Sequence, residues 1–417
     1  KGGFRNTGLD PEASFEGCRR RAMEIVAQLL AVNYTWDVAH TYAEYATTGR
    51  YLPENNAVTG IKVWPAEQAG QHDVFLTVPR WRPGVPATLS KLVSVDGESV
   101  LSPWPSWEMQ TEGDCSAIQY VQSMEIEPTR GEMWVLDVGR RNFADAPFSE
   151  PDNTCAPKVV IIDMTEFPGS IKTVYEFPDE VASHHASFLN DIVVDNRRQV
   201  AFMSDAGTGA IVAYDRISAT SRRFSDDTTK NEASFGFEIN GIDYGNATFT
   251  TPADGIALLP DRTRVVYCAL QGSTLWSVSA DALANMHSST AEVQATQINL
   301  GRKASASDGL AFDCEGKLYF GGLTTDALYS WPYDTNQSVA LAAVVAQDPE
   351  LLHWVDTFAF DMSGGLYVTT NKLDTYFTRT MDFKPSSLPN FRVIRFDVGR
   401  QSYMLPCDAS APGATEN

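Results

Sequence analysis

A recurring pair of β-rich stretches constrains the fold of this chain more than any other feature. Each copy opens with Asp, Asn or Gln, enters a short apolar stretch, and is followed about a dozen residues later by a second β-rich stretch. The five copies begin at residues 122, 190, 254, 308 and 356, so consecutive starts are 68, 64, 54 and 48 residues apart. Repeats of this size, each holding several short strands, are typical of propeller blades.

A sixth module precedes the five copies. It comprises two β-rich stretches, residues 60–64 and 73–78. We therefore predict an all-β fold, a six-bladed β-propeller over residues 51–405, followed by a C-terminal tail over residues 406–417. A closed ring of sheets removes most of the exposed strand edges that a large open sheet would present.

The first fifty residues are predicted to form an N-terminal extension. Within it, five apolar residues occur at helical spacing: Ala22, Ile25, Val26, Leu29 and Leu30. This spacing predicts a short amphipathic helix over residues 15–32 that covers one edge of the propeller.

The net charge and the hydropathy of the chain limit the classes of molecule that it is expected to bind. The formal net charge of −21 disfavours nucleic acid and anionic membranes, so we expect neither as a partner. The longest apolar run, Val339–Ala346, is far shorter than the roughly 18 residues that a membrane-spanning helix needs, so we expect no membrane insertion. An acidic protein attracts cationic ligands, although a merely solvated acidic surface explains the same charge. The oligomeric state is left open.

The six cysteines contain no C-x-x-C pair, which disfavours zinc-ribbon and thioredoxin-like sites. An even number suits three disulfides, which six cysteines can form in about 15 ways. We hypothesise the pairs Cys115–Cys155, Cys268–Cys314 and Cys18–Cys407, of which the last would clasp the two ends of the ring.

Three N-x-S/T sequons begin at Asn33, Asn246 and Asn336, all in polar or turn-like surroundings. Together with the cysteines they predict a secreted, extracellular glycoprotein. The chain begins at Lys1 without an initiator Met or an apolar signal region. We interpret it as a mature form after signal removal.

Two polar connectors, residues 141–156 and 225–250, are long enough to be functional loops or lids. The segment PRWRPG over residues 79–84 has the composition of a ligand clamp. It also has a sufficient structural explanation, because Pro and Gly fix turns and Arg stacks on Trp.

Several motifs resemble those of one known family. The segments are 51–56 (YLPENN), 60–64 (GIKVW), 76–89 (LTVPRWRPGVPATL), 132–140 (EMWVLDVGR), 189–195 (LNDIVVD), 356–360 (DTFAF) and 370–373 (TNKL). Over roughly residues 50–400 the chain resembles a divergent member of the Yellow/major royal jelly protein family. This resemblance implies a secreted, often glycosylated six-bladed propeller. Roles in the family include cuticle pigmentation, conversion of dopachrome-like aminochromes, capture of biogenic amines, and nutrition or storage.

The residues that open the repeats are candidates for a ligand site. In a propeller they would form a ring at the mouth of the axial channel: Gln122, Asn190, Asp254, Asp308 and Asp356. Convergent carboxylates in a partly dry site would favour an ammonium group or a metal ion. The alternative is that each Asp caps the turn of its own strand.

The family resemblance adds three residues to this site. It implies that Thr357 and Asn371 hold hydroxyl or amine groups of a ligand, as in amine-binding members. It also implies that the residue two positions after the Asn packs against the ligand ring. That residue is Leu373 here, which is aliphatic and points to a different ligand.

His184 and His185 precede the third inner strand and are candidate catalytic residues. A histidine pair can shuttle protons near neutral pH, as the isomerisation of an aminochrome requires. The alternative is two ordinary loop histidines, and the same alternative holds for His353. No histidine has H-E-x-x-H spacing, so a zinc hydrolase is not expected. We expect no cofactor; an axial Ca²⁺ held by carboxylate and amide oxygens is the alternative.

Taken together, the sequence predicts a secreted propeller that binds a small aromatic or cationic molecule in its central channel, such as a biogenic amine or a pigment-like compound. Two alternatives stay open. One is an enzyme, a dopachrome-type tautomerase, and the other is a non-catalytic structural or storage protein.

Overall fold

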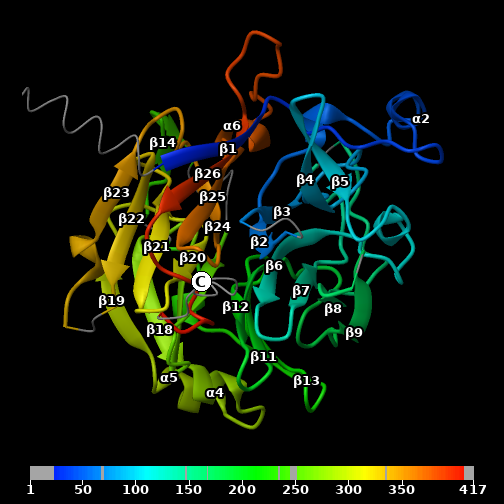
Figure 1. The fold of residues 1–417 in the computed structure, drawn as a ribbon. Helices are drawn as coiled ribbons and strands as arrows, with labels where there is room; N and C mark the ends of the chain where they lie inside the picture. Colours follow the sequence, from blue (N-terminus) through cyan, green and yellow to red (C-terminus); the bar gives the residue numbers. More distant parts are fainter. Residues whose placement is uncertain are drawn as a thin grey trace, which may run out of the picture.

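The predicted six-bladed β-propeller is confirmed. The computed structural model describes residues 23–66, 70–145, 148–166, 168–232, 235–244, 251–333 and 336–407. These residues form six four-stranded antiparallel sheets arranged around a common axis (Figure 1). The first strand of each blade packs against the first strands of its two neighbours, so these six inner strands surround the channel.

The first five blades are simple meanders. Blade 1 contains β2 (Ile61–Pro65), β3 (His72–Thr77), β4 (Leu89–Val95) and β5 (Glu98–Pro103). Blade 2 contains β6 (Val121–Glu127), β7 (Glu132–Asp137), β8 (Lys158–Asp163) and β9 (Ser170–Glu176). Blade 3 contains β10 (Leu189–Asp195), β11 (Val200–Asp205), β12 (Ala210–Asp215) and β13 (Thr220–Phe224). Blade 4 contains β16 (Ala253–Leu258), β17 (Arg264–Ala269), β18 (Thr274–Ser279) and β19 (Ile298–Arg302). Blade 5 contains β20 (Leu310–Phe312), β21 (Lys317–Gly322), β22 (Ala327–Pro332) and β23 (Ala343–Gln347).

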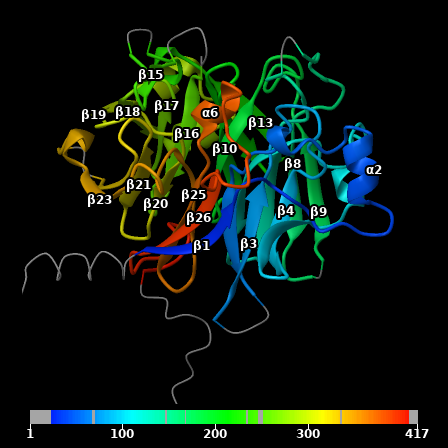
Figure 2. The ribbon, with the colours of Figure 1, turned by 90° about the horizontal axis from the view of Figure 1, so that it is seen from above.

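The sixth blade joins the two ends of the described chain. It contains β24 (Val355–Phe360), β25 (Gly365–Thr370), β26 (Phe391–Asp397) and, as its outermost strand, β1 (Met23–Leu29). Strand β1 pairs antiparallel with β26, with Ile25 opposite Ile394, and the two strands lie side by side in Figures 1 and 2. The ring is thus closed by pairing between distant parts of the chain.

The helix predicted over residues 15–32 is therefore wrong for Met23–Leu29, and residues 15–22 lie outside the described part. The edge of β26 supplies backbone partners that a short isolated helix would lack, and this pairing overrides the local spacing. The short helix of the N-terminal region is α2 (Tyr42–Thr47), which Thr41 caps. Because β1 belongs to blade 6, the propeller includes chain before residue 51.

Short elements occupy the connectors. The 3₁₀ turns are η1 (Pro53–Asn55), η2 (Glu108–Gln110), η3 (Asp227–Thr229) and η4 (Val339–Leu341). The others are the hairpin β14 (Glu238–Ile239) and β15 (Ile242–Asp243), and the helices α4 (Ala280–Ala284), α5 (Thr290–Gln294) and α6 (Leu373–Phe377). Helix α6 and the β14–β15 hairpin lie at the same end of the propeller, which we call the upper end (Figure 2). No helix within the described ranges is long and apolar enough to cross a bilayer.

The inner strands share an irregularity at the residues that open the repeats. The pairing register shifts between Val121 and Ser123 and, in three further blades, between Leu189 and Ile192, Ala253 and Ile256, and Val355 and Phe358. Bulges of this kind re-aim side chains at the rim of a sheet. They place the repeat-opening side chains where the channel begins.

Steric constraints explain why glycine follows the repeat-opening Asp in blades 4 and 5. A Cβ on Gly255 would lie 2.3 Å from the carbonyl oxygen of Asp308, and one on Gly309 would lie 2.6 Å from that of Asp356. Gly309 also donates its backbone N–H to the Asp356 carbonyl at 2.9 Å. Glycine therefore lets neighbouring inner strands approach each other closely at the channel wall.

The disulfides agree with the prediction only in part. Cys115–Cys155 forms as hypothesised. The pairs Cys268–Cys314 and Cys18–Cys407 are wrong, because Cys314 pairs with Cys407 and Cys268 is a buried free thiol. An isolated bridge between Asp313 and Ser402 brings the C-terminal segment beside blade 5, next to Cys314. Cys18 lies outside the described residues.

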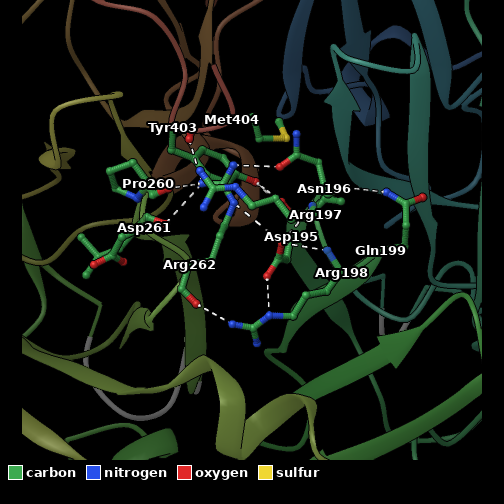
Figure 3. Close-up of polar contacts among 12 residues, drawn as sticks. Asp195, Asn196, Arg197, Arg198, Gln199, Pro260, Asp261, Arg262, Tyr403 and Met404 are labelled. Atoms are coloured by element: carbon green, nitrogen blue, oxygen red, sulfur yellow. Dashed lines mark hydrogen bonds and ion pairs between the residues drawn. The ribbon is translucent and has the colours of Figure 1, made fainter. Parts of the chain in front are cut away.

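The C-terminal segment, residues 401–407, crosses the lower end of the propeller, and we call it the strap. The Tyr403 hydroxyl accepts a hydrogen bond from the Val194 N–H at 2.9 Å and donates one to the Val194 carbonyl at 3.0 Å. Arg262 donates to the Tyr403 carbonyl at 2.8 Å and to Asn196 at 2.8 Å, as Figure 3 shows. The guanidinium also lies 5.0 Å from the Tyr403 ring. These contacts and the Cys314–Cys407 disulfide fix the strap to blades 3, 4 and 5.

Candidate functional site

A cavity of about 640 Å³ opens at the upper end of the channel, where the inner strands begin. We call it the upper cavity. Small-molecule sites commonly have volumes of roughly 300–1,000 Å³. The five residues predicted to form a ring all line it: Gln122, Asn190, Asp254, Asp308 and Asp356. The fold thus brings together side chains separated by more than two hundred residues of sequence, and their role in binding stays a prediction.

The carboxyl groups of Asp254, Asp308 and Asp356 form the floor of the cavity, and we call them the acid ring. The Asn190 amide donates to Asp254 at 2.7 Å, and the Trp354 indole N–H donates to Asp308 at 2.8 Å. None of these donors carries a charge. The acid ring is thus held in place by hydrogen bonds without being neutralised by them.

Burial raises the pKa of all three acid-ring carboxyls well above the ordinary value. Charge repulsion adds to this effect, since Asp254 raises the pKa of Asp308, and Asp308 raises that of Asp356. Like charges confined in a site of low dielectric constant cannot all ionise without large cost. The ring is therefore suited to hold protons or to face a cationic group.

Two of the residues taken from the family resemblance lie behind or below this floor. Asn371 is fully buried and donates to Asp356 at 2.5 Å and to the Val58 carbonyl at 2.9 Å. Thr357 donates to Asp356 at 2.7 Å and lines the channel below the upper cavity. Both therefore position Asp356. Leu373, at the start of α6, does line the upper cavity.

Aromatic rings make up much of the walls of the upper cavity, and the Arg140 guanidinium also lines it. The rings come from five residues: Trp81, Phe143, Phe188, Trp354 and Phe377. Phe143 and Phe188 have ring centroids 5.3 Å apart, and Trp81 and Phe377 lie 4.9 Å apart edge to face. The connectors between strands therefore supply most of the aromatic wall above the acidic floor. At position 373, where the resemblance implies an aromatic residue, the chain has leucine.

Two of these aromatic residues carried a signal in the sequence. Phe143 lies in the connector 141–156, whose length allows a functional loop or lid, and the Arg140 guanidinium sits 4.5 Å from its ring. Trp81 lies in the PRWRPG segment. The neighbouring Arg80 is fully buried and donates to backbone carbonyls, including that of Val85 at 3.0 Å. Within this segment, Arg80 therefore stabilises the fold, and Trp81 lines the cavity.

The structure separates the candidate catalytic histidines. His185 is exposed and lines the rim of the upper cavity. The His184 ring nitrogen Nδ1 instead lies 2.6 Å from the Asp179 carboxylate, away from the cavity lining. His353 is paired with the buried Asp374 at 2.8 Å. Of the three, His185 is the one that lines the upper cavity.

The Lys62 side chain lines the part of the channel below the upper cavity, where it faces Glu125. Across the described ranges, no group of three or more His, Cys, Asp and Glu side chains has a geometry that would hold a metal. The sequons at Asn33 and Asn336 are exposed, whereas Asn246 lies outside the described residues.

Comparison with known proteins identifies the family of the chain. The sequence profile of the "Major royal jelly protein" family matches residues 123–407, more than half of the chain. The chain belongs to this family. The match covers nearly all of blade 2, blades 3 to 5, three of the four strands of blade 6 and the strap, and so it includes the acid ring.

Members of the family called "Protein yellow" match part of the chain. The protein of Drosophila yakuba is 29% identical over 214 residues, which cover 48% of this chain and 37% of that protein. The protein of Drosophila melanogaster is 31% identical over 186 residues, which cover 43% of this chain and 32% of that protein. The matches thus span about a third of each relative, and this royal-jelly-family chain is a divergent member.

Two solved structures superpose on the chain at a low level of similarity. A luciferin-regenerating enzyme has a TM-score of 0.47 at 14% identity, covering 84% of this chain and 96% of its own. A putative gluconolactonase has a TM-score of 0.47 at 10% identity, covering 83% and 90%. At this level of similarity, they carry no information about activity.

Proposed function

We propose that this propeller binds a small molecule that carries both an aromatic ring and a positive charge, such as a biogenic amine or a pigment-like compound. One observation carries the proposal: three buried carboxyls with raised pKa values form the floor of a cavity whose walls are aromatic. A bound ammonium group would let the acid ring ionise, which uncharged donors do not.

The two parts of such a ligand match the two parts of the cavity. Its cationic group would face Asp308 and the other acid-ring carboxyls, where Coulomb attraction is strong because the site is poorly hydrated. Its ring would lie among Phe143, Phe188 and Trp81, which supply apolar area and favourable contact with a cation. The walls approach the ligand from several blades, so Leu373 need not supply the stacking surface.

Secretion is part of the same proposal. Two disulfides form in the described chain, and disulfides persist mainly in oxidising compartments. The exposed sequons at Asn33 and Asn336 would be available for glycosylation there. Analysis of the native protein with and without a glycosidase would test this directly.

The binding test compares ligands of the same shape and opposite charge. Dopamine and 3,4-dihydroxyphenylacetate share a catechol ring, but one carries an ammonium group and the other a carboxylate. By calorimetry we expect binding of dopamine, or of serotonin, and at least tenfold weaker binding of the acid, which corresponds to about 1.4 kcal/mol. Equal affinity for both, or no heat with any amine, would reject the proposal and favour a structural or storage role.

The position of His185 supports a second candidate function, a dopachrome-type tautomerase. His185 is the candidate catalytic histidine at the rim of the cavity, within the described residues. Decay of aminochrome absorbance faster than with heat-treated protein would support this function. His185→Gln should then slow the decay, whereas His184→Gln should not, because His184 is paired with Asp179 outside the cavity lining.

A further inference from the structure

The lower part of the channel has a different composition from the upper cavity. A small space of about 60 Å³ lies along the inner strands between the acid ring and the strap, and we call it the lower channel. Three charged side chains from neighbouring inner strands meet there: Lys62 of β2, Glu125 of β6 and Asp191 of β10. All three are largely buried, with 13% of the Lys62 side chain and 9% of the Glu125 side chain exposed.

We propose that the Lys62 ammonium takes the place of an axial metal ion and is the resident cation of this propeller. Its Nζ donates to the Phe358 carbonyl at 2.9 Å and lies 3.7 Å from a Glu125 carboxylate oxygen. A main-chain carbonyl and a carboxylate are the oxygen ligands that a hard cation such as Ca²⁺ takes. Lys62 occupies that environment with a covalently attached charge.

The buried carboxyls of Glu125 and Asp191 are stabilised in their charged form by this positive charge. Burial raises the pKa values of Glu125 and Asp191, and Lys62 is the strongest influence that lowers both. Neutral donors complete their hydrogen bonds: Ser123 donates to Asp191 at 2.8 Å, and the Ile126 N–H donates to Glu125 at 2.9 Å. The lysine therefore supplies the charge, and the neutral donors fix the geometry.

The other titratable groups around the lower channel do not compete for this role. Asp361 is paired with Arg395 at 2.9 Å. His72 lines the opening on the side of β3, and Tyr403 of the strap covers the lower end. A second cation placed beside Lys62 would be repelled by it at short range, where screening by water is weak. The site therefore excludes metal ions as long as Lys62 is present.

The test is thermal unfolding of the full chain with and without millimolar CaCl₂ at pH 5 and pH 8. Wild type is expected to show no Ca²⁺-dependent shift. In Lys62→Met, the carboxyls lose their counter-charge, so their folded-state pKa values rise further and stability falls as pH rises through those values. We expect the midpoint at pH 8 to fall by about 5 °C relative to wild type, and Ca²⁺ to recover part of this loss.

Lys91→Met is the matched control in the same blade. Lys91 also pairs with a carboxylate, Asp73 at 2.6 Å, but this pair is partly exposed, so a small shift without Ca²⁺ response is expected. The double variant Lys62→Met/Glu125→Gln removes both charges and should fold without responding to Ca²⁺, and Lys62→Arg should remain unresponsive. Stabilisation of wild type by Ca²⁺, or a Lys62→Met protein that matches wild type at both pH values, would overturn the proposal. Because a cation is also expected at the acid ring, each comparison is repeated with Asp254, Asp308 and Asp356 replaced by Asn, and the outcome in that background decides.

Discussion

The two halves of the channel are built from adjacent residues of the same strands, yet they differ in charge balance and access. The upper cavity holds about 640 Å³ and has three carboxyls on its floor, whose hydrogen-bond donors among the described residues are uncharged. The lower channel holds about 60 Å³, contains its own cation, and ends at the strap. Asn190 faces the upper cavity while the next residue, Asp191, faces the lower channel.

This difference teaches how a single repeat can serve two purposes. In the lower channel the fold supplies one positive charge, on Lys62, to two buried carboxyls, Glu125 and Asp191. In the upper cavity the hydrogen-bond donors described for the acid ring are uncharged, and the proposed ligand would bring the positive charge. Buried groups with perturbed pKa values in an accessible cavity are characteristic of functional sites. Four predictions test this contrast, in order of decreasing expected effect.

The largest effect on stability is expected from opening the strap, which covers the lower half of the channel and not the upper cavity. The double variant Cys314→Ser/Cys407→Ser removes a crosslink between residues 93 positions apart, and should lower the free energy of unfolding by about 3 kcal/mol in urea titrations. Cys115→Ser/Cys155→Ser, which opens a 40-residue separation, should cost less. Amine binding in the upper cavity should persist in the strap variant. Its loss would show that the two halves are not independent.

The acid ring predicts how stability varies with pH. The folded-state pKa values of Asp254, Asp308 and Asp356 are raised, so the folded protein holds more protons than the unfolded chain. Their contribution to stability is complete below the unfolded pKa of about 4 and is lost as pH rises through the folded values. Each such proton should give a slope of up to about 1.4 kcal/mol per pH unit. Urea titrations at several pH values should show this slope, and replacing all three by Asn should flatten it.

The substitution Asp308→Asn tests whether the acid ring of the upper cavity contributes to ligand binding. Asparagine keeps an oxygen that can accept the Trp354 N–H, so the fold should be retained. Loss of one negative charge should weaken amine binding about tenfold, or about 1.4 kcal/mol, while stability at pH 7 is unchanged or higher. Asp179→Asn, which changes an exposed carboxylate outside the cavity, serves as the control. An unchanged amine affinity in calorimetry would remove the acid ring from binding.

The smallest effect is expected from the aromatic wall. Phe188→Leu should weaken binding of an aromatic amine a few-fold, because loss of an aromatic contact costs about 1 kcal/mol, and should weaken an aliphatic amine of similar size less. Phe188 is partly exposed at the cavity, so little loss of stability is expected. If both amines lose affinity equally, the wall shapes the cavity without recognising the ligand ring.

The sequence allowed the architecture and the floor of the site to be predicted, but not its walls. The acid ring was predictable because its members open successive repeats, and the fold maps equal positions in the repeats onto one ring. Phe143, Phe188 and Phe377 lie outside the inner strands, so their convergence had no periodic signal. Lys62 was visible in the GIKVW segment, yet its position beside Glu125 depends on packing between two blades.

The predictions that proved wrong concern segments near the two ends of the described chain. Residues 23–29 have apolar residues at helical spacing, but the free edge of β26 makes them a strand. The pairing of Cys314 with Cys407 follows from the course of the strap, which no spacing of cysteines encodes.

The sequence by itself determined the six repeats, their all-β character, and the acidic or amide residue that leads most of the inner strands, because these follow from local periodicity. The tertiary structure alone decided which carboxyls received a charged partner, which aromatic rings met above them, and which cysteines were joined. Those outcomes depend on contacts between segments far apart in the chain, whose distances are set only when the ring of blades closes.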